Sequence, residues 1–390
     1  MKHRILLIMV LSLSFLCHGL LAADSPKSLV IRAGKIWTVT NGVITDGVVI
    51  IQNGKINAVG ENPSIPSEAR ILEMPGKNVM PGLIDAHSHL GLSLDVLGEI
   101  EETVSAITPD MQILDAFNPL ADDVRKALRS GVTTVLLAPG YKNPIAGQTA
   151  IVKLYGAKTG DWVLKRNAGI KFSLGNEALM SDRRPTSRSG LMALIREELN
   201  KGKDYKEDEL DPRGEIIKRV VEGELPVYLY CNTVDEIVAA IRIVDEYELK
   251  AMLVGAREAD EVANMIADRN IPVVYMPSLF LSKDKDLKRI GKVAGAGVRV
   301  AFASLAPKTH SSDLRTSAIV AAKYGLSSEL ALKSLTINAA EILGIAQRVG
   351  SIEKGKDADL VILNGDPLEV TSGVEMVIIN GNIVYQREEK

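Results

Sequence analysis

The sequence contains few aromatic residues, few cysteines and little net charge. Phe, Trp and Tyr together make up 4% of the 390 residues, so platforms on which bases or sugar rings stack are not expected. The formal net charge is −3, which argues against nucleic-acid binding through phosphate contacts. Cys17 and Cys231 are the two cysteines, too few for a disulfide framework. With 46% hydrophobic and 24% charged residues, the composition is that of a globular protein.

The first 23 residues are typical of a secretory signal peptide. Lys2 and Arg4 give a positively charged start, an apolar run follows over residues 5–16, and Ala22-Ala23 offers small residues for cleavage. We therefore predict an exported protein, periplasmic or secreted, without a stable membrane span once residues 1–23 are removed. Cys231 is then the one remaining cysteine, so no intrachain disulfide is expected.

The two ends of the mature chain have β-rich patterns. Residues 28–40 and 47–59 are rich in Val and Ile, and Asn53-Gly54 is a tight-turn signal. Short apolar strands and the turn signal Asn380-Gly381 recur near the C-terminus. We predict that residues 24–80 and 345–390 pair into one small composite β-sandwich.

Residues 81–344 alternate short apolar strands with helical segments. In the clearest helix, residues 235–247, Thr233 and Glu236 form a capping box and apolar residues recur at helical spacing. About eight such β/α units fit this region, which predicts a TIM (β/α)8 barrel. The predicted fold class is thus α/β, a TIM barrel with a small β-sandwich.

The motif PGLIDAHSH at residues 81–89 carries the strongest chemical signal. His87 and His89 are two residues apart at the end of a predicted strand, so their side chains point to the same side. At the carboxyl end of a barrel strand they could bind one metal ion, zinc or another divalent cation. Asp85 lies on the same face, where it could orient a histidine as a hydrogen-bond acceptor. Read alone, the pair could also be two incidental histidines.

This motif resembles the first-strand signature of the amidohydrolase superfamily. The resemblance extends over about residues 28–388 and includes GVTTVLLAPG, NPIAGQ, GIKFSLGNE, INAAEILGI and GSIEKGKDADLVILNGDPL. It is greatest for exported imidazolonepropionase-like amidohydrolases. The resemblance implies a metal-bearing barrel, a small β-sandwich built from both chain ends, and hydrolysis of non-peptide carbon–nitrogen bonds.

The resemblance also implies further metal-site residues, and here the sequence departs from the family pattern. The family usually adds a Lys or Glu after strand 4, a His after strands 5 and 6, and an Asp after strand 8. Alignment by eye places Asn176, Tyr230, Gly255 and Leu305 at these positions. Because the aspartate usually serves as the catalytic base, and leucine cannot accept a proton, these replacements predict an eroded metal site with doubtful catalysis.

Several residues are candidates to replace the missing groups. His310 and Cys231 are candidate metal ligands. The simpler interpretation of His310 is a solvent-facing loop histidine, and that of Cys231 is a small buried cysteine. Residues predicted to lie at the barrel mouth are further candidates. The candidate catalytic groups are Asp313, Glu177 and Tyr230. The candidate substrate-binding groups are Arg183, Arg184 and Arg188.

Two functional hypotheses therefore stay open. The first is a metal-dependent hydrolase with a rewired site, acting on a small-molecule substrate. The second is a catalytically dead homologue that binds a small molecule or forms a structural partner of an active paralogue, as a homo- or hetero-oligomer.

Overall fold

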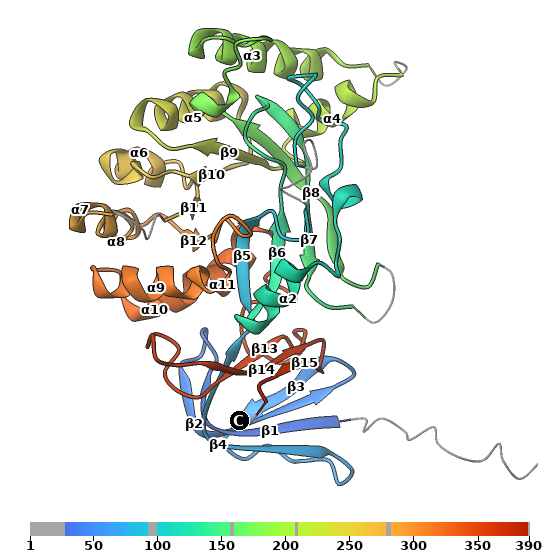
Figure 1. Cartoon of the computed structure of the whole chain (residues 1–390), viewed down its shortest axis with the longest axis vertical. Coiled ribbons are helices and arrows are strands. Elements are labelled where there is room, and N and C mark those ends of the chain that lie inside the picture. The colour runs from blue at the N-terminus through green and yellow to red at the C-terminus, as the bar shows by residue number, and fades with distance from the viewer. Residues whose placement is uncertain (1–27, 93–99, 157–159, 207–209, 278–281, 389–390) are drawn as a thin grey trace, which may run out of the picture.

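The computed structural model describes residues 28–92, 100–156, 160–206, 210–277 and 282–388. The predicted signal peptide, residues 1–23, lies outside these residues. Within them, no helix is long and apolar enough to cross a membrane. The chain forms two bodies, an α/β barrel and a smaller β domain beneath it in Figure 1.

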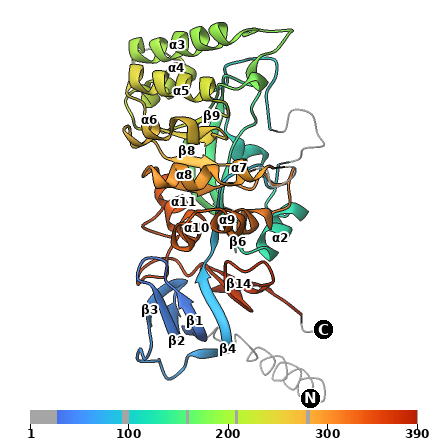
Figure 2. The same cartoon turned by 90° about the vertical axis from the view of Figure 1, so that its left-hand side faces the viewer.

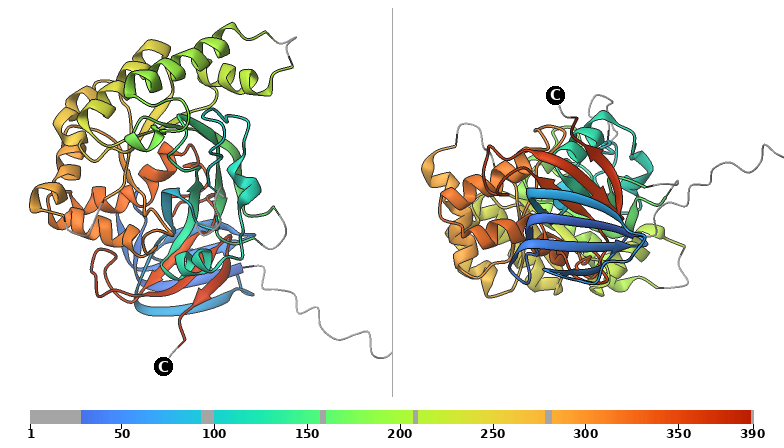
Figure 3. Two further views of the ribbon diagram at one scale, coloured as in Figure 1. Left: turned by 45° about the horizontal axis from the view of Figure 1, so that its top comes forward. Right: turned by 90° about the horizontal axis from the view of Figure 1, so that it is seen from below.

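The β domain combines strands from both ends of the chain. Its seven strands form one sheet in the order β15-β14-β13-β4-β1-β2-β3. Seen from below, the strands of the two chain ends lie side by side (Figure 3). These strands are β1 (Ser28–Trp37), β2 (Val43–Gln52), β3 (Lys55–Gly60), β4 (Arg70–Pro81), β13 (Leu360–Leu363), β14 (Val374–Ile379) and β15 (Asn382–Gln386).

Local sequence explains how this sheet turns and where its core lies. Asn53 and Gly54 have φ values of 51° and 75°, and Asn380 and Gly381 have 49° and 75°, as tight hairpins with two left-handed residues require. Apolar side chains of the N-terminal strands, among them Ile31 and Val49, share one buried cluster with those of the C-terminal strands. The composite β domain predicted from the hydrophobic pattern is thus confirmed.

The barrel is an eight-stranded, nearly closed sheet in the order β12-β11-β10-β9-β8-β7-β6-β5. One strand departs from a regular (β/α)8 barrel, because β7 is antiparallel to both of its neighbours. The strands are β5 (Leu83–Ser88), β6 (Val132–Leu137), β7 (Ile145–Lys153), β8 (Val163–Ser173), β9 (Val227–Cys231), β10 (Ala251–Gly255), β11 (Val273–Tyr275) and β12 (Val300–Phe302).

Helices cover the outer face of the barrel after most of these strands (Figures 1 and 2). The helix predicted from the capping box runs from Val234 to Tyr247, and the Glu236 carboxylate accepts a hydrogen bond from the Thr233 amide at 3.3 Å. The helices and short turns are η1 (Ile113–Ala116), α2 (Asp122–Arg129), η2 (Asn176–Ala178), α3 (Arg188–Asp204), α4 (Pro212–Val221), α5 (Val234–Tyr247), η3 (Ala259–Val262), α6 (Ala263–Ala267), α7 (Asp284–Leu287), α8 (Arg289–Gly295), α9 (Asp313–Lys323), α10 (Ser328–Ser334) and α11 (Ile337–Ile342).

The barrel strands are buried on both faces, which explains their nearly continuous apolar sequences. One cluster, with Ile84, Tyr228 and Val254, fills the barrel interior. A larger cluster, with Leu229 and Ile237, lies between the strands and the helices. The parallel strands end at the same edge, so residues at their carboxyl ends meet at one mouth.

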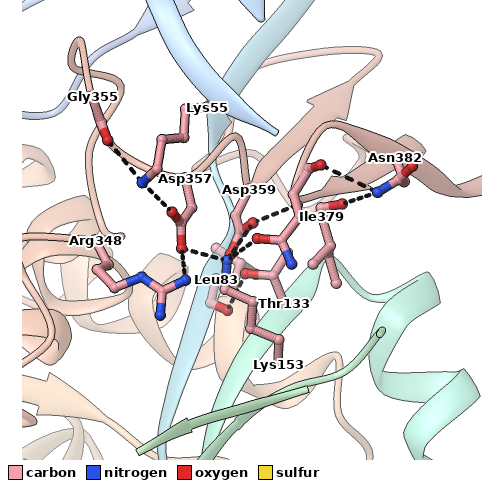
Figure 4. Close-up of polar contacts among 11 residues, drawn as sticks. Lys55, Leu83, Thr133, Lys153, Arg348, Gly355, Asp357, Asp359, Ile379 and Asn382 are labelled. Atoms are coloured by element: carbon pink, nitrogen blue, oxygen red, sulfur yellow. Dashed lines mark hydrogen bonds and ion pairs between the residues drawn. The ribbon is translucent and has the colours of Figure 1, made fainter. Parts of the chain in front are cut away.

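A buried ionic cluster joins the barrel to the β domain (Figure 4). Lys153, on β7, is 2% exposed, and its Nζ lies 2.8 Å from Asp357 Oδ2 and 2.9 Å from Asp359 Oδ2. Lys55 and Arg348 also pair with Asp357, at 3.0 and 2.6 Å. Because Asp357 and Asp359 lead into β13, this cluster fixes the β domain against the base of the barrel.

Candidate functional site

His87 and His89 lie together at the carboxyl end of β5. Both are fully buried, with exposed fractions of 0% and 1%, and their rings are 5.3 Å apart and nearly perpendicular. Every residue of β5 is buried, so the strand is held in the barrel core and carries the two imidazoles to its mouth. The structure thus brings the predicted pair together where a barrel fold places its active sites.

The polar contacts of the two imidazole rings indicate which ring nitrogens have a hydrogen-bond partner. His89 Nδ1 lies 2.9 Å from the Ala138 carbonyl, so this nitrogen carries the proton and leaves a lone pair on Nε2. That Nε2 is 3.3 Å from the Tyr141 hydroxyl. His87 Nε2 lies 3.0 Å from Lys171 Nζ, while its Nδ1 has no hydrogen-bond partner among the described residues.

Lys171 is a candidate site residue that the sequence alignment missed. It lies on β8 and is 0% exposed, and its Nζ contacts the carbonyl oxygens of Pro139 and Gly140 at 3.4 and 3.5 Å. The same nitrogen sits 4.0 Å from the centre of the Tyr141 ring. Within the described residues, no carboxylate lies within ion-pair distance of this amine. It is therefore Lys171, and not Asn176, that stands beside the histidines at the fourth barrel strand.

Burial sets the protonation of this group of residues. It lowers the pKa of Lys171 to about 7, because the charges of Glu101 and Glu177, which are not within ion-pair distance, offset only part of the loss of water around the ammonium. Burial, followed by the charge of Lys171, lowers the pKa of His89 to about 3 and holds that of His87 well below its usual range. Both imidazoles are therefore neutral, as a metal ligand must be.

Asp85 has a different partner from the one predicted. Its carboxylate accepts hydrogen bonds from the Ser304 amide at 3.1 Å, from the Ser304 hydroxyl, and from the His87 amide at 3.4 Å. Among the described residues no imidazole nitrogen is bonded to it, so these contacts give no support to the predicted role of Asp85 in orienting a histidine side chain. It joins β5 to the loop after β12, and burial raises its pKa to about 6.

Two tyrosines lie over the histidines. The Tyr141 ring stacks on His87 at 5.7 Å and meets His89 edge-on at 5.5 Å. Tyr230, at the end of β9, packs against Tyr141 at 4.2 Å and donates a hydrogen bond to Glu177 at 3.3 Å. Burial raises the pKa of Tyr230 to about 12, so its hydroxyl stays protonated at neutral pH. Tyr141 thus contacts both imidazoles directly, and Tyr230 packs on Tyr141.

A cleft of about 320 Å³ lies outside this pair of rings, at the barrel mouth. Its lining contains the predicted candidates Glu177, Tyr230 and Asp313, together with Leu305. It also contains Arg257 and Lys308, which were not singled out in the sequence. The volume is at the lower end of the range for small-molecule sites, roughly 300–1,000 Å³.

The backbone conformation at the other substituted positions restricts which side chains could be accommodated there. Gly255 has a φ of 87°, and a Cβ there would lie 2.7 Å from Asn232 Oδ1, so a histidine would require local rearrangement. Leu305 also has a positive φ, 63°, which is unfavourable for a branched side chain and more favourable for Asp or Asn. Asn176 is exposed and accepts a hydrogen bond from Arg188 at 3.2 Å, away from the histidines.

Neither of the two candidate replacement ligands reaches the pair. His310 is exposed, and its Nδ1 lies 2.7 Å from the Ser312 hydroxyl. Cys231 is buried in the cluster between strands and helices, on the opposite side of β9 from Tyr230, and burial raises the pKa of its thiol. Cys231 is therefore a core residue, as its simpler interpretation held, and His310 is a loop histidine.

The three predicted substrate-binding arginines do not line the cleft either. Arg183 donates to the Lys142 carbonyl and to Asn143, at 3.0 and 2.7 Å. Arg184 is exposed, with Glu197 3.9 Å away, and Arg188 pairs with acidic residues at the start of α5. Each contributes to the surface around the loop after β8, and not to the cleft.

The donor set fits one metal ion better than two. No group of three or more His, Cys, Asp or Glu side chains in the described ranges has the arrangement of a metal site. His87, His89 and Lys171 nevertheless supply three nitrogens, with 3.0 Å between His87 Nε2 and Lys171 Nζ. Catalytic zinc sites usually have three protein ligands, drawn from His, Cys, Asp and Glu, and an open position, so a lysine amine as third donor would depart from the usual set. The orientation of His89 by a backbone carbonyl is a further feature of metal-ligating histidines.

The sequence did contain a signal for Lys171. It lies within GIKFSLGNE, between the apolar residues Ile170 and Phe172, in the fully buried half of β8. A lysine in such a strand is rare unless it is paired or functional. Tyr141, by contrast, follows a glycine in a loop, and its position over the histidines depends on tertiary packing.

Comparisons with known proteins support the family resemblance and the fold. The profile of the amidohydrolase family matches residues 227–384. An amidohydrolase from Thermotoga maritima MSB8 is 32% identical with a TM-score of 0.86, over 92% of this chain and 100% of that one. The imidazolonepropionase of Thermoplasma volcanium is 24% identical over 89% of this chain and 92% of that protein. The amidohydrolase tasK of Hapsidospora irregularis is 24% identical over 87% of this chain, which spans 40% of that longer protein.

Proposed function

We propose, from the premise that this chain belongs to the amidohydrolase superfamily, that it hydrolyses a non-peptide carbon–nitrogen bond with one divalent metal ion. The observation that carries the proposal is the grouping of His87, His89 and Lys171 at the carboxyl end of the barrel. Zinc is the metal best suited to nitrogen donors in this number. We also propose export of the protein, on the pattern of residues 1–23.

The three donors would each hold the metal through a nitrogen lone pair. A divalent ion bound there supplies a Lewis acid that polarises the substrate carbonyl and makes water a better nucleophile. The imidazoles are ready for this role because burial keeps them neutral. The Lys171 amine loses its proton readily because burial lowers its pKa to about 7.

The chain's own residues would then bind and orient the substrate in the cleft. Tyr141 and Tyr230 limit the access of water to the imidazoles and leave the cleft as the route of approach. Glu177 and Asp313 are the carboxylates in the cleft lining and can accept a proton there. Because Leu305 stands in the loop where the resemblance expects the catalytic aspartate, we expect slow hydrolysis. A positioned base typically contributes ~10²–10⁴ in rate.

Metal analysis and a substrate panel together test the proposal. Protein purified without chelator is analysed for metal and then assayed against hydantoins, dipeptides and lactams. We expect one divalent ion per chain and slow hydrolysis of at least one class, both lost in His89→Gln. His310→Gln is the matched control and should retain both, because His310 is exposed and outside the site. Wild-type protein without stoichiometric metal, or a His89→Gln variant of unchanged activity, would overturn the proposal.

A further inference from the structure

Two positively charged side chains in the cleft lining have no charged or hydrogen-bonded partner among the residues that the structure describes. Arg257 follows β10 by two residues, and Lys308 lies in the loop after β12. Neither side chain forms an ion pair or hydrogen bond with the described residues. Other basic residues of this region are already engaged: Arg289, for example, pairs with Asp260 at 2.6 Å.

The order of the strands places these two cations around one part of the cleft. β10 and β12 flank β11 in the sheet, so Arg257 and Lys308 stand on either side of the residues that follow β11. Those residues, Met276 and Pro277, give the cleft an apolar wall between the two charges. Glu177 comes from the loop after β8, two strands away from β10.

The charges of the cleft lining are unevenly distributed. The side formed by the loops after β10 and β12 carries the two cations together with Asp313, and the side formed by the loop after β8 carries Glu177, bonded to Tyr230. Asp313, at the start of α9, lies more than 4 Å from both cations, because no ion pair joins them. An anionic group could thus contact Arg257 and Lys308 with an apolar side chain against Met276 and Pro277.

The anion would also lie near the proposed reacting centre. The loop after β12 that carries Lys308 contacts the histidine segment directly, because the His89 amide donates a hydrogen bond to the Ala306 carbonyl at 2.9 Å. A ligand held by Lys308 would extend from the cleft toward the histidines.

We propose that Arg257 and Lys308 bind the carboxylate of the substrate, so that the preferred substrates are small N-acyl amino acids or related amides with a free carboxylate. This inference rests on the proposed function for the identity of the reacting bond, and on the cleft for the carboxylate. The planar Arg257 guanidinium can bind a carboxylate with two parallel hydrogen bonds, and Lys308 adds a point charge. A cleft of about 320 Å³ suits a ligand of amino-acid size.

A pair of probes that differ in this one group tests the inference. N-acetyl-L-leucine carries the carboxylate, and N-acetyl-L-leucinol replaces it by an uncharged hydroxymethyl group. Isothermal titration of the intact protein should give at least ~10-fold tighter binding of the carboxylate probe, the usual scale of one charge-assisted contact. Arg257→Gln should lose most of this preference and Lys308→Gln part of it, with binding of the alcohol unchanged within about twofold.

Arg184→Gln serves as the matched control. Arg184 is an exposed arginine of the loop after β8, outside the cleft lining, so its replacement should leave both affinities unchanged. Equal binding of the two probes, absence of binding at millimolar concentration, or an unaffected preference in Arg257→Gln would overturn the inference.

Free leucine is measured in the same samples, so that the two proposals can fail separately. Carboxylate-dependent binding without hydrolysis of any panel substrate contradicts the proposed function and leaves the binding site in place. Hydrolysis with no preference for the carboxylate contradicts the binding site and leaves the proposed function in place.

Discussion

Lys153 and Lys171 are two buried lysines on neighbouring barrel strands with opposite surroundings. Lys153, on β7, faces Asp357 and Asp359 at 2.8 and 2.9 Å, at the joint with the β domain. Lys171, on β8, faces His87 and two backbone carbonyls, with no carboxylate within ion-pair distance in the described residues. Both side chains are almost completely excluded from water, with exposed fractions of 2% and 0%.

The comparison shows that the partner, and not burial itself, decides the role of a buried charge. A lysine between carboxylates forms ion pairs that fix the position of the groups around it. A buried lysine with no carboxylate at ion-pair distance has a lowered pKa, which makes its neutral amine more accessible at a cost in stability. A buried lysine thus occurs both at the joint between the domains and at the barrel mouth, with ion-pair partners in the first place and without them in the second.

Removing the paired lysine should have the largest effect on stability. In Lys153→Met, Asp357 and Asp359 would be left buried without their common counter-charge, at a cost of about 3–5 kcal/mol in the free energy of unfolding. Denaturant unfolding measures the change. Lys55→Met is the control, because Lys55 pairs with the same Asp357 from an exposed position and should cost only about 0–1 kcal/mol. Equal losses of unfolding free energy in the two variants would show that burial of Lys153 does not determine its contribution to stability.

Supplying a carboxylate at the mouth should have the next largest effect, this time on rate. Leu305→Asp introduces a proton acceptor in the cleft and places at a φ of 63° a residue that tolerates this conformation better than leucine. We expect hydrolysis of the best panel substrate to rise at least ~10-fold, with unchanged or higher stability. Leu305→Asn offers the same backbone preference without the base and should not raise the rate. A rise in both variants would attribute the effect to the backbone.

Removing the unpaired lysine should change stability much less than removing the paired one. Lys171→Met replaces a poorly solvated amine by an apolar side chain of similar length, so the free energy of unfolding should stay within about 1 kcal/mol of wild type. Unfolding is measured with a chelator present, so that metal binding does not contribute. A loss as large as that of Lys153→Met would mean that Lys171 has a structural partner.

Replacement of Cys231 should have the smallest effect on stability and metal content. Cys231→Ala removes a buried sulfur from the cluster between strands and helices, which should cost on the order of 1 kcal/mol and leave the metal content unchanged. Thermal unfolding and metal analysis of the same sample check both expectations. Loss of metal in this variant would bring Cys231 back as a ligand.

Much of the fold could be predicted from local sequence. The hairpin at Asn53-Gly54 and the helix after Thr233 each follow from residues close in sequence, and strands buried on both faces explain the apolar runs of the barrel. The reversal of β7 could not be predicted, because it depends on how β6, β7 and β8 pair and not on their composition. The Lys153 cluster joins residues about 200 positions apart, which no local pattern indicates.

The site was predicted in part. The spacing of His87 and His89 placed them on one side of a strand, and the structure has them together at the mouth. The alignment by eye selected Asn176, five residues beyond Lys171, because a strand end cannot be located to the residue from sequence. Arg257 and Lys308 come from different loops, so their meeting in one cleft depends on the closed arrangement of the strands.

The metal content of Lys171→Met, compared with that of wild type, tests the account most directly. Both proteins are purified without chelator, loaded with zinc, freed of excess metal and analysed for bound metal per chain. The account predicts one zinc ion in wild type and a loss of retained zinc in Lys171→Met, at an unfolding stability close to that of metal-free wild type. Retention of one zinc ion by the variant, or none by wild type, would contradict the role of Lys171 as the third donor.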